Sequence, residues 1–110
     1  MKKNLILSGV TVSPGSVEGK ARIINNVEDL AKVEEDEIVF LPKSHPMYAI
    51  AVLRASGVVC EYGGKLSHIC IVSLEMGLPC ITKVKEARAA VKDGQLVYLD
   101  ADKGEVYLYE

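Results

Sequence analysis

Short apolar runs, separated by glycine, proline and acidic residues, divide this chain into strand-length and helix-length segments. Residues 5–12 alternate weakly between apolar and polar and predict a strand, and residues 16–24 predict a second one. Ser13-Pro14-Gly15 between them has proline and glycine where turns favour them, so it predicts a hairpin turn. The continuous apolar run at residues 38–42 is typical of a strand buried in a parallel sheet.

Two helices are expected on either side of that buried strand. Residues 27–33 have the apolar spacing of a short helix, and the positions predicted to face inward are Val27, Leu30, Ala31 and Val33. A second helix should begin at Pro46 with Ser44 or His45 as its cap, and its helical spacing is set by Met47, Ile50, Ala51 and Leu53 or Arg54. The acidic residues 34–37 lack the alternating spacing of a calcium loop and predict a solvated connection.

A third helix is expected over residues 68–76 because both of its ends are marked. Ser67 is a typical N-cap residue, Gly77 stands where a C′ glycine is expected, and Pro79 follows where a helix cannot continue. The many apolar residues of this segment predict a nearly buried helix with only Ser73 and Glu75 pointing outward. A short buried strand at residues 58–60 should lead into this helix, and a strand at residues 79–82 should follow it.

The remaining pattern completes an α/β fold. Residues 83–91 predict a weak helix or an irregular segment, and residues 95–99 and 105–109 alternate around residues 100–104 as in a hairpin. The order strand, helix, strand, loop, helix, strand is typical of a sheet with helices packed on it. We therefore expect one domain over residues 1–110, with a mixed sheet, packed helices and a β-hairpin layer.

Composition and charge exclude several classes of function. Of the 110 residues, 49% are apolar and 25% charged, and no apolar run approaches the ~18 residues of a membrane span. The net charge is −2, and scattered Lys and Arg without an aromatic set for stacking argue against a nucleic-acid surface. The first residues, Met-Lys-Lys-Asn, precede only three apolar residues, too few for a signal peptide, so a cytoplasmic protein is expected.

The three cysteines, Cys60, Cys70 and Cys80, form no C-x-x-C pair. Buried free thiols are therefore expected in preference to a metal site or a disulfide. The chain also lacks a Gly-rich loop of the P-loop or dinucleotide-binding type. It is consequently not expected to bind and orient a nucleotide with its magnesium, which phosphoryl transfer requires.

The candidate chemistry is concentrated in Gly63-Gly64-Lys65-Leu66-Ser67-His68, where two glycines allow a bulky anion to approach the backbone. His68 would be the first residue of a helix, where unpaired N–H groups and a partial positive charge disfavour protonation of an imidazole and attract an anion. A neutral imidazole is a nucleophile, and a phosphoryl group on it would be held by the same amides and the Ser67 hydroxyl. The residues alone also permit a plain turn with a half-buried histidine. His45 is either a second catalytic base or a loop residue.

The run Gly-Gly-x-x-Ser-His, followed by an apolar helix and Gly-Leu-Pro, resembles the phosphohistidine motif of the phosphoenolpyruvate-utilising enzymes. These include phosphoenolpyruvate synthase, pyruvate phosphate dikinase, enzyme I of the sugar phosphotransferase system and rifampicin phosphotransferase. The similarity covers nearly the whole chain. Residues 12–19 resemble the opening strand and turn of the family, residues 36–40 its next strand, and residues 92–106 its closing hairpin.

The resemblance implies a swivelling β/β/α domain that shuttles between an ATP-binding domain and a barrel that binds pyruvate or phosphoenolpyruvate. His68 would be the nucleophile that carries the phosphoryl group covalently, with Gly63, Gly64 and Ser67 holding its oxygens and Lys65 as a charge contact. ATP and magnesium are expected only on the partner domains. No other cofactor, no metal site and no nucleic-acid or membrane partner is implied for this domain.

Two residues depart from the family pattern. Cys60 stands where the family usually has threonine, and Leu74 where it usually has arginine. A thiol is a poor hydrogen-bond donor to a phosphoryl oxygen, and leucine removes a fixed positive charge. Three interpretations therefore stay open: a phosphohistidine carrier, a non-catalytic regulatory or binding module, and a subunit of a small-molecule phosphotransferase. A carrier would be incomplete as an enzyme alone and would contribute to a phosphoenolpyruvate synthase-like activity, as a free-standing protein, a piece of a split enzyme or a part of a longer chain.

Overall fold

Two facing sheets that share one long strand form the framework of the computed structural model, which describes residues 2–110. The strands run in the order β1-β8-β7-β3-β4-β5-β6-β2. Their bounds are β1 (Lys3–Ser8), β2 (Val10–Ser13), β3 (Ser16–Ile23), β4 (Ile38–Leu41), β5 (Gly57–Cys60), β6 (Cys80–Thr82), β7 (Leu96–Asp100) and β8 (Glu105–Tyr109). The first part of β3 pairs antiparallel with β7 and its last part pairs parallel with β4, so this strand runs through both sheets.

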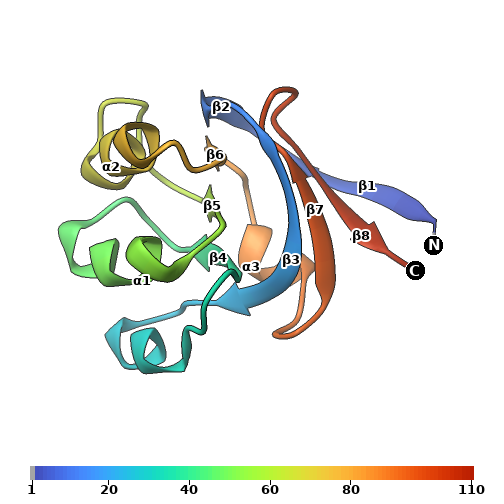
Figure 1. The fold of residues 1–110 in the computed structure, drawn as a ribbon, viewed down its shortest axis with the longest axis horizontal. Helices are drawn as coiled ribbons and strands as arrows, with labels where there is room; N and C mark the ends of the chain where they lie inside the picture. The colour runs from blue at the N-terminus through green and yellow to red at the C-terminus, as the bar shows by residue number, and fades with distance from the viewer. Residues whose placement is uncertain (1) are drawn as a thin grey trace.

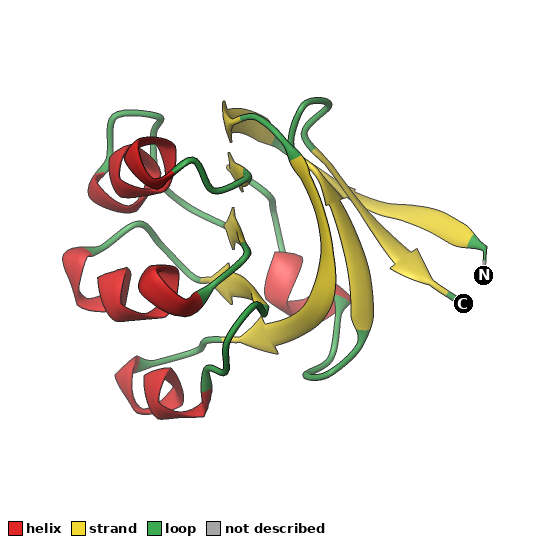
Figure 2. Ribbon diagram, viewed as in Figure 1, coloured by secondary structure: helices red, strands yellow, loops and turns green. Residues whose placement is uncertain are grey.

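The helical segments lie mainly on one side of this framework. They are η1 (Val27–Lys32), η2 (Pro46–Tyr48), α1 (Ala49–Arg54), α2 (His68–Met76) and α3 (Ala87–Ala90). Figures 1 and 2 show α1 and α2 on the outer face of the sheet that contains β4, β5 and β6, whereas β7 and β8 lie on its other side. The chain is thus a three-layered β/β/α structure with a mixed sheet, which confirms the expected fold class.

Two separate hydrophobic cores explain why β4 is apolar at every position. Ile38 and Phe40 pack between the two sheets, whereas Val39 and Leu41 pack against the helices, because successive side chains of a strand point to opposite faces. All four are fully buried, and burial of each such side chain stabilises the fold by about 1.5–3 kcal/mol. The prediction of a buried parallel strand is confirmed, since β4 pairs parallel with both β3 and β5.

The predicted hairpin at Ser13-Pro14-Gly15 is wrong. β2 pairs with β6 at one edge of the sheet, while β3 pairs with β4 and β7. The predicted strand over residues 5–12 is also divided at Gly9, whose N–H donates to the carbonyl oxygen of Gly104 at 2.8 Å. The chain therefore bends from one sheet to the other at both places, and the local turn residues specify the bend without specifying the strand partner.

The faces predicted for the first two helices are partly wrong. In η1, Val27 and Ala31 are exposed and Leu30 is half-buried, although Val33 just after it is buried. The segment is a 3-10 helix, in which the side chains that share a face are three residues apart, so fewer of its apolar residues can reach the core than in the predicted α-helix.

In the second helical segment the exposed apolar residues are those that set the predicted spacing, Met47, Ile50 and Leu53. Of the predicted positions only Ala51 is buried, and it packs on the sheet together with Tyr48 and Val52. The change from 3-10 geometry in η2 to α geometry in α1 rotates the later positions relative to a uniform α-helix.

The acidic connection at residues 34–37 is not fully solvated, because Glu37 is buried. Its two carboxylate oxygens accept hydrogen bonds from Nε and Nη2 of Arg22 at 3.0 and 2.9 Å, and one of them also accepts from the N–H of Glu34 at 2.8 Å. Burial raises the pKa of Glu37, but these hydrogen bonds outweigh it and hold the pKa below its ordinary value. Glu37 thus forms a two-bond ion pair that joins the connection before β4 to β3.

Candidate functional site

The loop between β5 and α2 has a backbone that requires glycine at one position. Gly63 has a φ of +141°, a conformation that side chains with a Cβ rarely adopt, and a Cβ there would lie 2.6 Å from Cβ of Ser44. Gly64 is different, because no atom lies within 4 Å of a Cβ built on it. The loop is therefore packed tightly at Gly63 and open at Gly64.

Two hydroxyl residues from other parts of the chain hold this loop. The Oγ1 atom of Thr82, at the end of β6, donates to the carbonyl oxygen of Gly63 at 2.7 Å. Ser44, which follows β4, donates its N–H to the carbonyl oxygen of Tyr62 at 2.8 Å. Both contacts fix carbonyl groups that precede Gly64.

The bounds predicted for the third helix and the N-cap position of Ser67 are confirmed, but the capping hydrogen bond comes from another residue. Ser67 occupies the N-cap position without a side-chain capping bond, and its hydroxyl donates to the carbonyl oxygen of Gly64. The first-turn N–H of Ile69 donates instead to Oγ of Ser44 at 2.9 Å. Sequence reasoning could not find this cap, because Ser44 lies 25 residues earlier in the chain.

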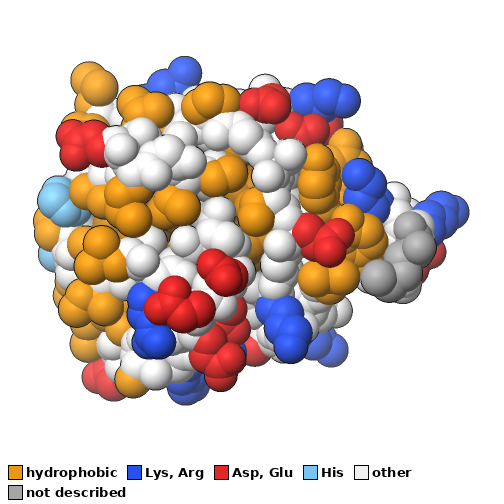
Figure 3. Space-filling model, viewed as in Figure 1, with side chains coloured by type: hydrophobic (Ala, Val, Ile, Leu, Met, Phe, Trp, Pro, Cys, Tyr) orange, Lys and Arg blue, Asp and Glu red, His pale blue; other side chains and the backbone are white. Residues whose placement is uncertain are grey.

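His68 is exposed at the first position of α2. Within residues 2–110, the N–H groups of His68, Cys70 and Gly64 have no hydrogen-bond acceptor, whereas that of Ile71 donates to the carbonyl oxygen of Ser67. Figure 3 shows histidine atoms at the end of the molecule where the helices lie, bordered by hydrophobic side chains. The site thus combines an accessible imidazole with free amides at a helix N-terminus, which is a favourable place for an anion.

The other predicted site residues lie around this imidazole on the same loop. Lys65 is exposed and forms no ion pair in the described part of the chain, so its ammonium group is available to an anion. Leu66 beside it is 87% exposed.

His45 lies outside this loop and caps η2. Its Nδ1 atom accepts the N–H of Met47 at 3.1 Å, so the structure supports the interpretation of His45 as a loop residue.

The outward face of α2 differs from the prediction. Ser73 is fully buried, whereas Ile71, Leu74 and Met76 are exposed, with Leu74 at 54%. The helix packs on β2, β6 and α1, and its buried residues are Ile69, Cys70 and Ser73. Position 74 is therefore a surface position, occupied by leucine where the resemblance predicts arginine.

The three cysteines lie beneath the loop as buried free thiols, as predicted. Burial, reinforced by Cys70, raises the pKa of Cys60 to about 12, and its Sγ donates to the carbonyl oxygen of Tyr62 at 3.1 Å. The contact between the thiols of Cys70 and Cys80 lowers the pKa of Cys70 and, together with burial, raises the pKa of Cys80. Within residues 2–110, no three His, Cys, Asp or Glu side chains are placed to hold a metal ion.

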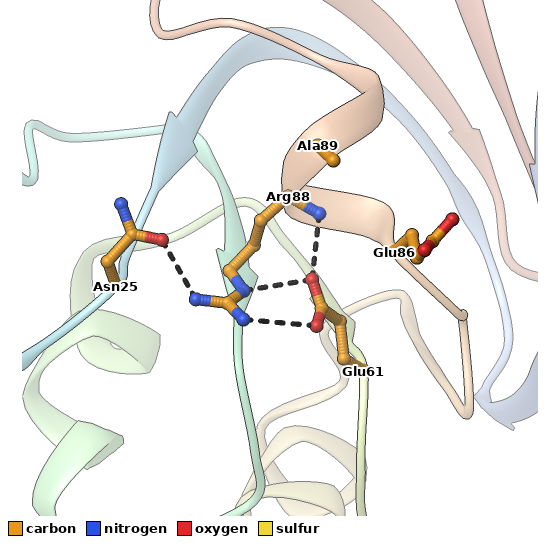
Figure 4. A pocket seen from close by; sticks show the side chains of 5 residues that line it. All are labelled: Asn25, Glu61, Glu86, Arg88 and Ala89. Atoms are coloured by element: carbon orange, nitrogen blue, oxygen red, sulfur yellow. Dashed lines mark hydrogen bonds and ion pairs between the residues drawn. The ribbon is translucent and has the colours of Figure 1, made fainter.

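An ion pair that the sequence did not reveal anchors the start of the loop. Glu61 is 7% exposed, and its carboxylate accepts from the N–H and Nε of Arg88, both at 2.8 Å, and from Nη2 at 3.2 Å. Figure 4 shows these bonds, together with the bond from Nη1 of Arg88 to Asn25 at 2.8 Å. A hollow of about 310 Å³ borders the pair, but the contacts satisfy its charges internally. Glu61 is consequently engaged by Arg88 and is not a carboxylate partner of the histidine.

Comparison with known proteins identifies relatives over most of the chain. The family described as "PEP-utilising enzyme, mobile domain" matches residues 33–104. Phosphoenolpyruvate synthase of Pyrococcus furiosus is 37% identical over 103 residues, which are 94% of this chain and 13% of that protein. The chain therefore spans a small fraction of the length of that relative. Among residues 2–110, none of the helices has the length and apolar character that a membrane span requires.

Solved structures share the fold at lower sequence identity. Thermococcus kodakaraensis aconitase X in its holo-form gives a TM-score of 0.70 at 16% identity, and the match covers all of both chains. Enzyme I (nEIt) gives a TM-score of 0.61 at 24% identity, over 77% of this chain and 34% of that chain. At these identities the likenesses establish the fold alone.

Proposed function

The chain belongs to the mobile-domain family of phosphoenolpyruvate-utilising enzymes, and from this membership we propose that it carries a phosphoryl group on His68 between two partners. One ring nitrogen of the neutral imidazole attacks the phosphorus atom of a donor, a nitrogen–phosphorus bond forms, and the bond from phosphorus to the donor oxygen breaks. An acceptor oxygen then attacks the same phosphorus atom and the nitrogen–phosphorus bond breaks. His68 is regenerated, as a carrier requires.

The observation that carries this proposal is the surroundings of the imidazole. His68 is exposed at the first position of a nine-residue helix, and the free N–H groups of His68, Cys70 and Gly64 lie in the same loop and first turn. Amides at a helix N-terminus stabilise the negative charge that a phosphoryl group adds. Lys65 contributes a mobile positive charge, while the Ser67 hydroxyl is a further donor once it leaves the Gly64 carbonyl.

The partners follow from the size of the relatives. Since the chain spans only 13% of phosphoenolpyruvate synthase from Pyrococcus furiosus, the rest of that protein supplies other domains. We propose that partners of the same kinds serve this chain, namely an ATP-binding domain and a barrel that binds pyruvate or phosphoenolpyruvate. ATP and magnesium would bind to the partners, and this domain would hold only the covalent phosphoryl group.

The test uses the Pyrococcus furiosus relative with its own matching segment removed. The chain is incubated with this partner and ATP or phosphoenolpyruvate, and its intact mass is measured before and after brief acid treatment. We expect one added phosphoryl group that acid removes, in the wild type and in His45→Ala, and none in His68→Ala. His45 is the matched control because it is the other of the two histidines and is also exposed.

A non-catalytic binding module is the second candidate, and Leu74 is the observation that favours it. An exposed leucine replaces the arginine that would balance the phosphoryl charge. On that interpretation the chain binds the partner without accepting a phosphoryl group. Binding without mass gain, while the intact relative phosphorylates its own segment, would support the binding module and contradict the carrier.

A further inference from the structure

We propose that Thr82 and Ser44 are positioning residues for phosphoryl transfer, which orient the amides around His68 without touching the reacting atoms. This inference rests on the proposed carrier function of His68. It assigns a role to two hydroxyl residues that lie outside the Gly-Gly-x-x-Ser-His run and come from two different strand ends. Each makes one side-chain hydrogen bond to the backbone of the loop or of the first helical turn.

Thr82 determines the direction of the Gly64 amide. Its Oγ1 atom, fully buried, donates to the carbonyl oxygen of Gly63 at 2.7 Å. The peptide bond that follows this carbonyl is planar and trans, so the N–H of Gly64 must point away from Thr82. Gly64 is exposed, and its N–H has no hydrogen-bond acceptor within residues 2–110. The buried hydroxyl thus turns a donor outward, where a phosphoryl oxygen can reach it.

Ser44 joins the loop to the first turn of α2. Its N–H donates to the carbonyl oxygen of Tyr62 at 2.8 Å, and its Oγ atom accepts the N–H of Ile69 at 2.9 Å. Because Ser44 caps Ile69, that amide is withdrawn from any ligand, while the amides of His68 and Cys70 stay free. The cap also leaves the Ser67 hydroxyl without a capping role.

Gly63, whose carbonyl Thr82 holds, packs directly against Ser44. A Cβ on Gly63 would lie 2.6 Å from Cβ of Ser44, so the two backbones are already in close contact. Loss of the Thr82 hydroxyl would free the Gly63 carbonyl to rotate, and the Gly64 N–H would rotate with it. We therefore expect His68 to react still with a phosphoryl donor, but to lose its advantage in rate over an exposed histidine elsewhere in the chain.

The experiment uses phosphoramidate, a small donor that needs no partner protein. An imidazole nitrogen attacks its phosphorus atom, the bond from phosphorus to the amino nitrogen breaks, and ammonia leaves with the proton that the imidazole releases. His45 is an internal reference, because it is exposed in the same molecule and lies outside the loop. Peptide mass spectrometry gives the ratio of phosphorylation rates at His68 and His45, which cancels differences between protein preparations.

We expect the wild type to favour His68, and the ratio to fall about tenfold in Thr82→Val, the change in rate that corresponds to about 1.4 kcal/mol. Valine keeps the shape of threonine but has no hydroxyl, whereas Thr82→Ser restores the donor and should restore the ratio. Recovery by serine is a result that a purely structural role of the side chain would not produce. An unchanged ratio in a folded Thr82→Val, or no recovery in Thr82→Ser, would overturn the assignment.

Ser44→Ala provides an independent variant, judged by the lifetime of phosphorylated His68 because the substitution is adjacent to His45. We expect hydrolysis about tenfold faster than in the wild type. Without the hydrogen bond from Ile69 to Ser44, the first turn of α2 is no longer tied to the loop, so the amides of His68 and Cys70 lose the alignment with which they donate to the phosphoryl group. An unchanged lifetime would contradict the role of Ser44. If the wild type showed no preference for His68, the carrier function itself would fail. A preference that survives Thr82→Val, together with a lifetime that survives Ser44→Ala, would refute only the positioning role.

Discussion

Substitution of Gly63 by alanine tests the geometry of the loop most severely. The φ of +141° at Gly63 is strained for alanine and costs about 1–3 kcal/mol. The new Cβ would lie 2.6 Å from Cβ of Ser44, where carbon atoms normally keep about 3.5–4.0 Å, and such overpacking costs a further 1–3 kcal/mol or so. We therefore expect Gly63→Ala to lower the free energy of unfolding by about 2–6 kcal/mol.

Thermal denaturation followed by circular dichroism measures this loss. In a domain of about this size each kcal/mol shifts the melting temperature by roughly 4–8 °C, so Gly63→Ala should melt at least about 8 °C below the wild type. Gly64→Ala is the matched control, because Gly64 has neither a positive φ nor a neighbour within 4 Å of the added Cβ. Equal melting temperatures for the two variants, or a larger loss in Gly64→Ala, would refute the loop geometry.

Three further predictions concern the surface of α2 and the ion pairs. Leu74→Arg should leave the melting temperature nearly unchanged because position 74 is 54% exposed, whereas Ile69→Arg, at a fully buried position of the same helix, should abolish folding. Arg88→Met leaves the buried Glu61 carboxylate short of donors and should lower the free energy of unfolding, measured by urea titration, by about 3 kcal/mol. Arg54→Met is the control, because the ion pair of Arg54 is exposed and its loss should have little effect. The folded pKa of Glu37 lies below its unfolded value of about 4.3. Its ion pair therefore stabilises the fold fully above about pH 5, and this stabilisation is lost as the pH falls through the folded pKa. Glu37→Gln should accordingly flatten the acid limb of a curve of unfolding free energy against pH.

Elements with local signals at both ends could be predicted from the sequence. The bounds of α2 follow from Ser67 and Gly77, and Gly77 indeed ends the helix with a φ of 70° and an N–H that donates to the carbonyl oxygens of Leu74 and Ser73. The hairpin of β7 and β8 was likewise predictable, since its strands alternate around a short turn and pair antiparallel. These features depend on residues close together in the chain.

Contacts between distant residues could not be predicted in this way. Glu37 lies in an acidic run that looks solvated, and only the fold brings Arg22 to it. Glu61 and Arg88 are 27 residues apart, and Ser44 is 25 residues from the amide that it caps. The position of the imidazole was therefore predictable, whereas the residues that hold its loop were not.

The inward faces of the helices were also beyond a purely local argument. An apolar residue can lie on the surface, and the pattern of α2 does not say which of its many apolar side chains meets the sheet. Contacts with β2 and β6 select Ile69 and Cys70 for the core and leave Leu74 outside. An arginine at position 74 would therefore be exposed, whereas the predicted helix, with only Ser73 and Glu75 outward, would have buried it.

A chase of the phosphorylated chain tests the carrier function most directly. The chain is first phosphorylated by the truncated Pyrococcus furiosus relative with phosphoenolpyruvate that is labelled in its phosphoryl group. It is then separated from both and mixed with fresh partner and unlabelled pyruvate. The account predicts that the label leaves His68 and appears in phosphoenolpyruvate much faster than it is lost to water without the partner. A label that stays on the chain, or that is lost at the same rate with and without partner and pyruvate, would contradict a phosphoryl carrier.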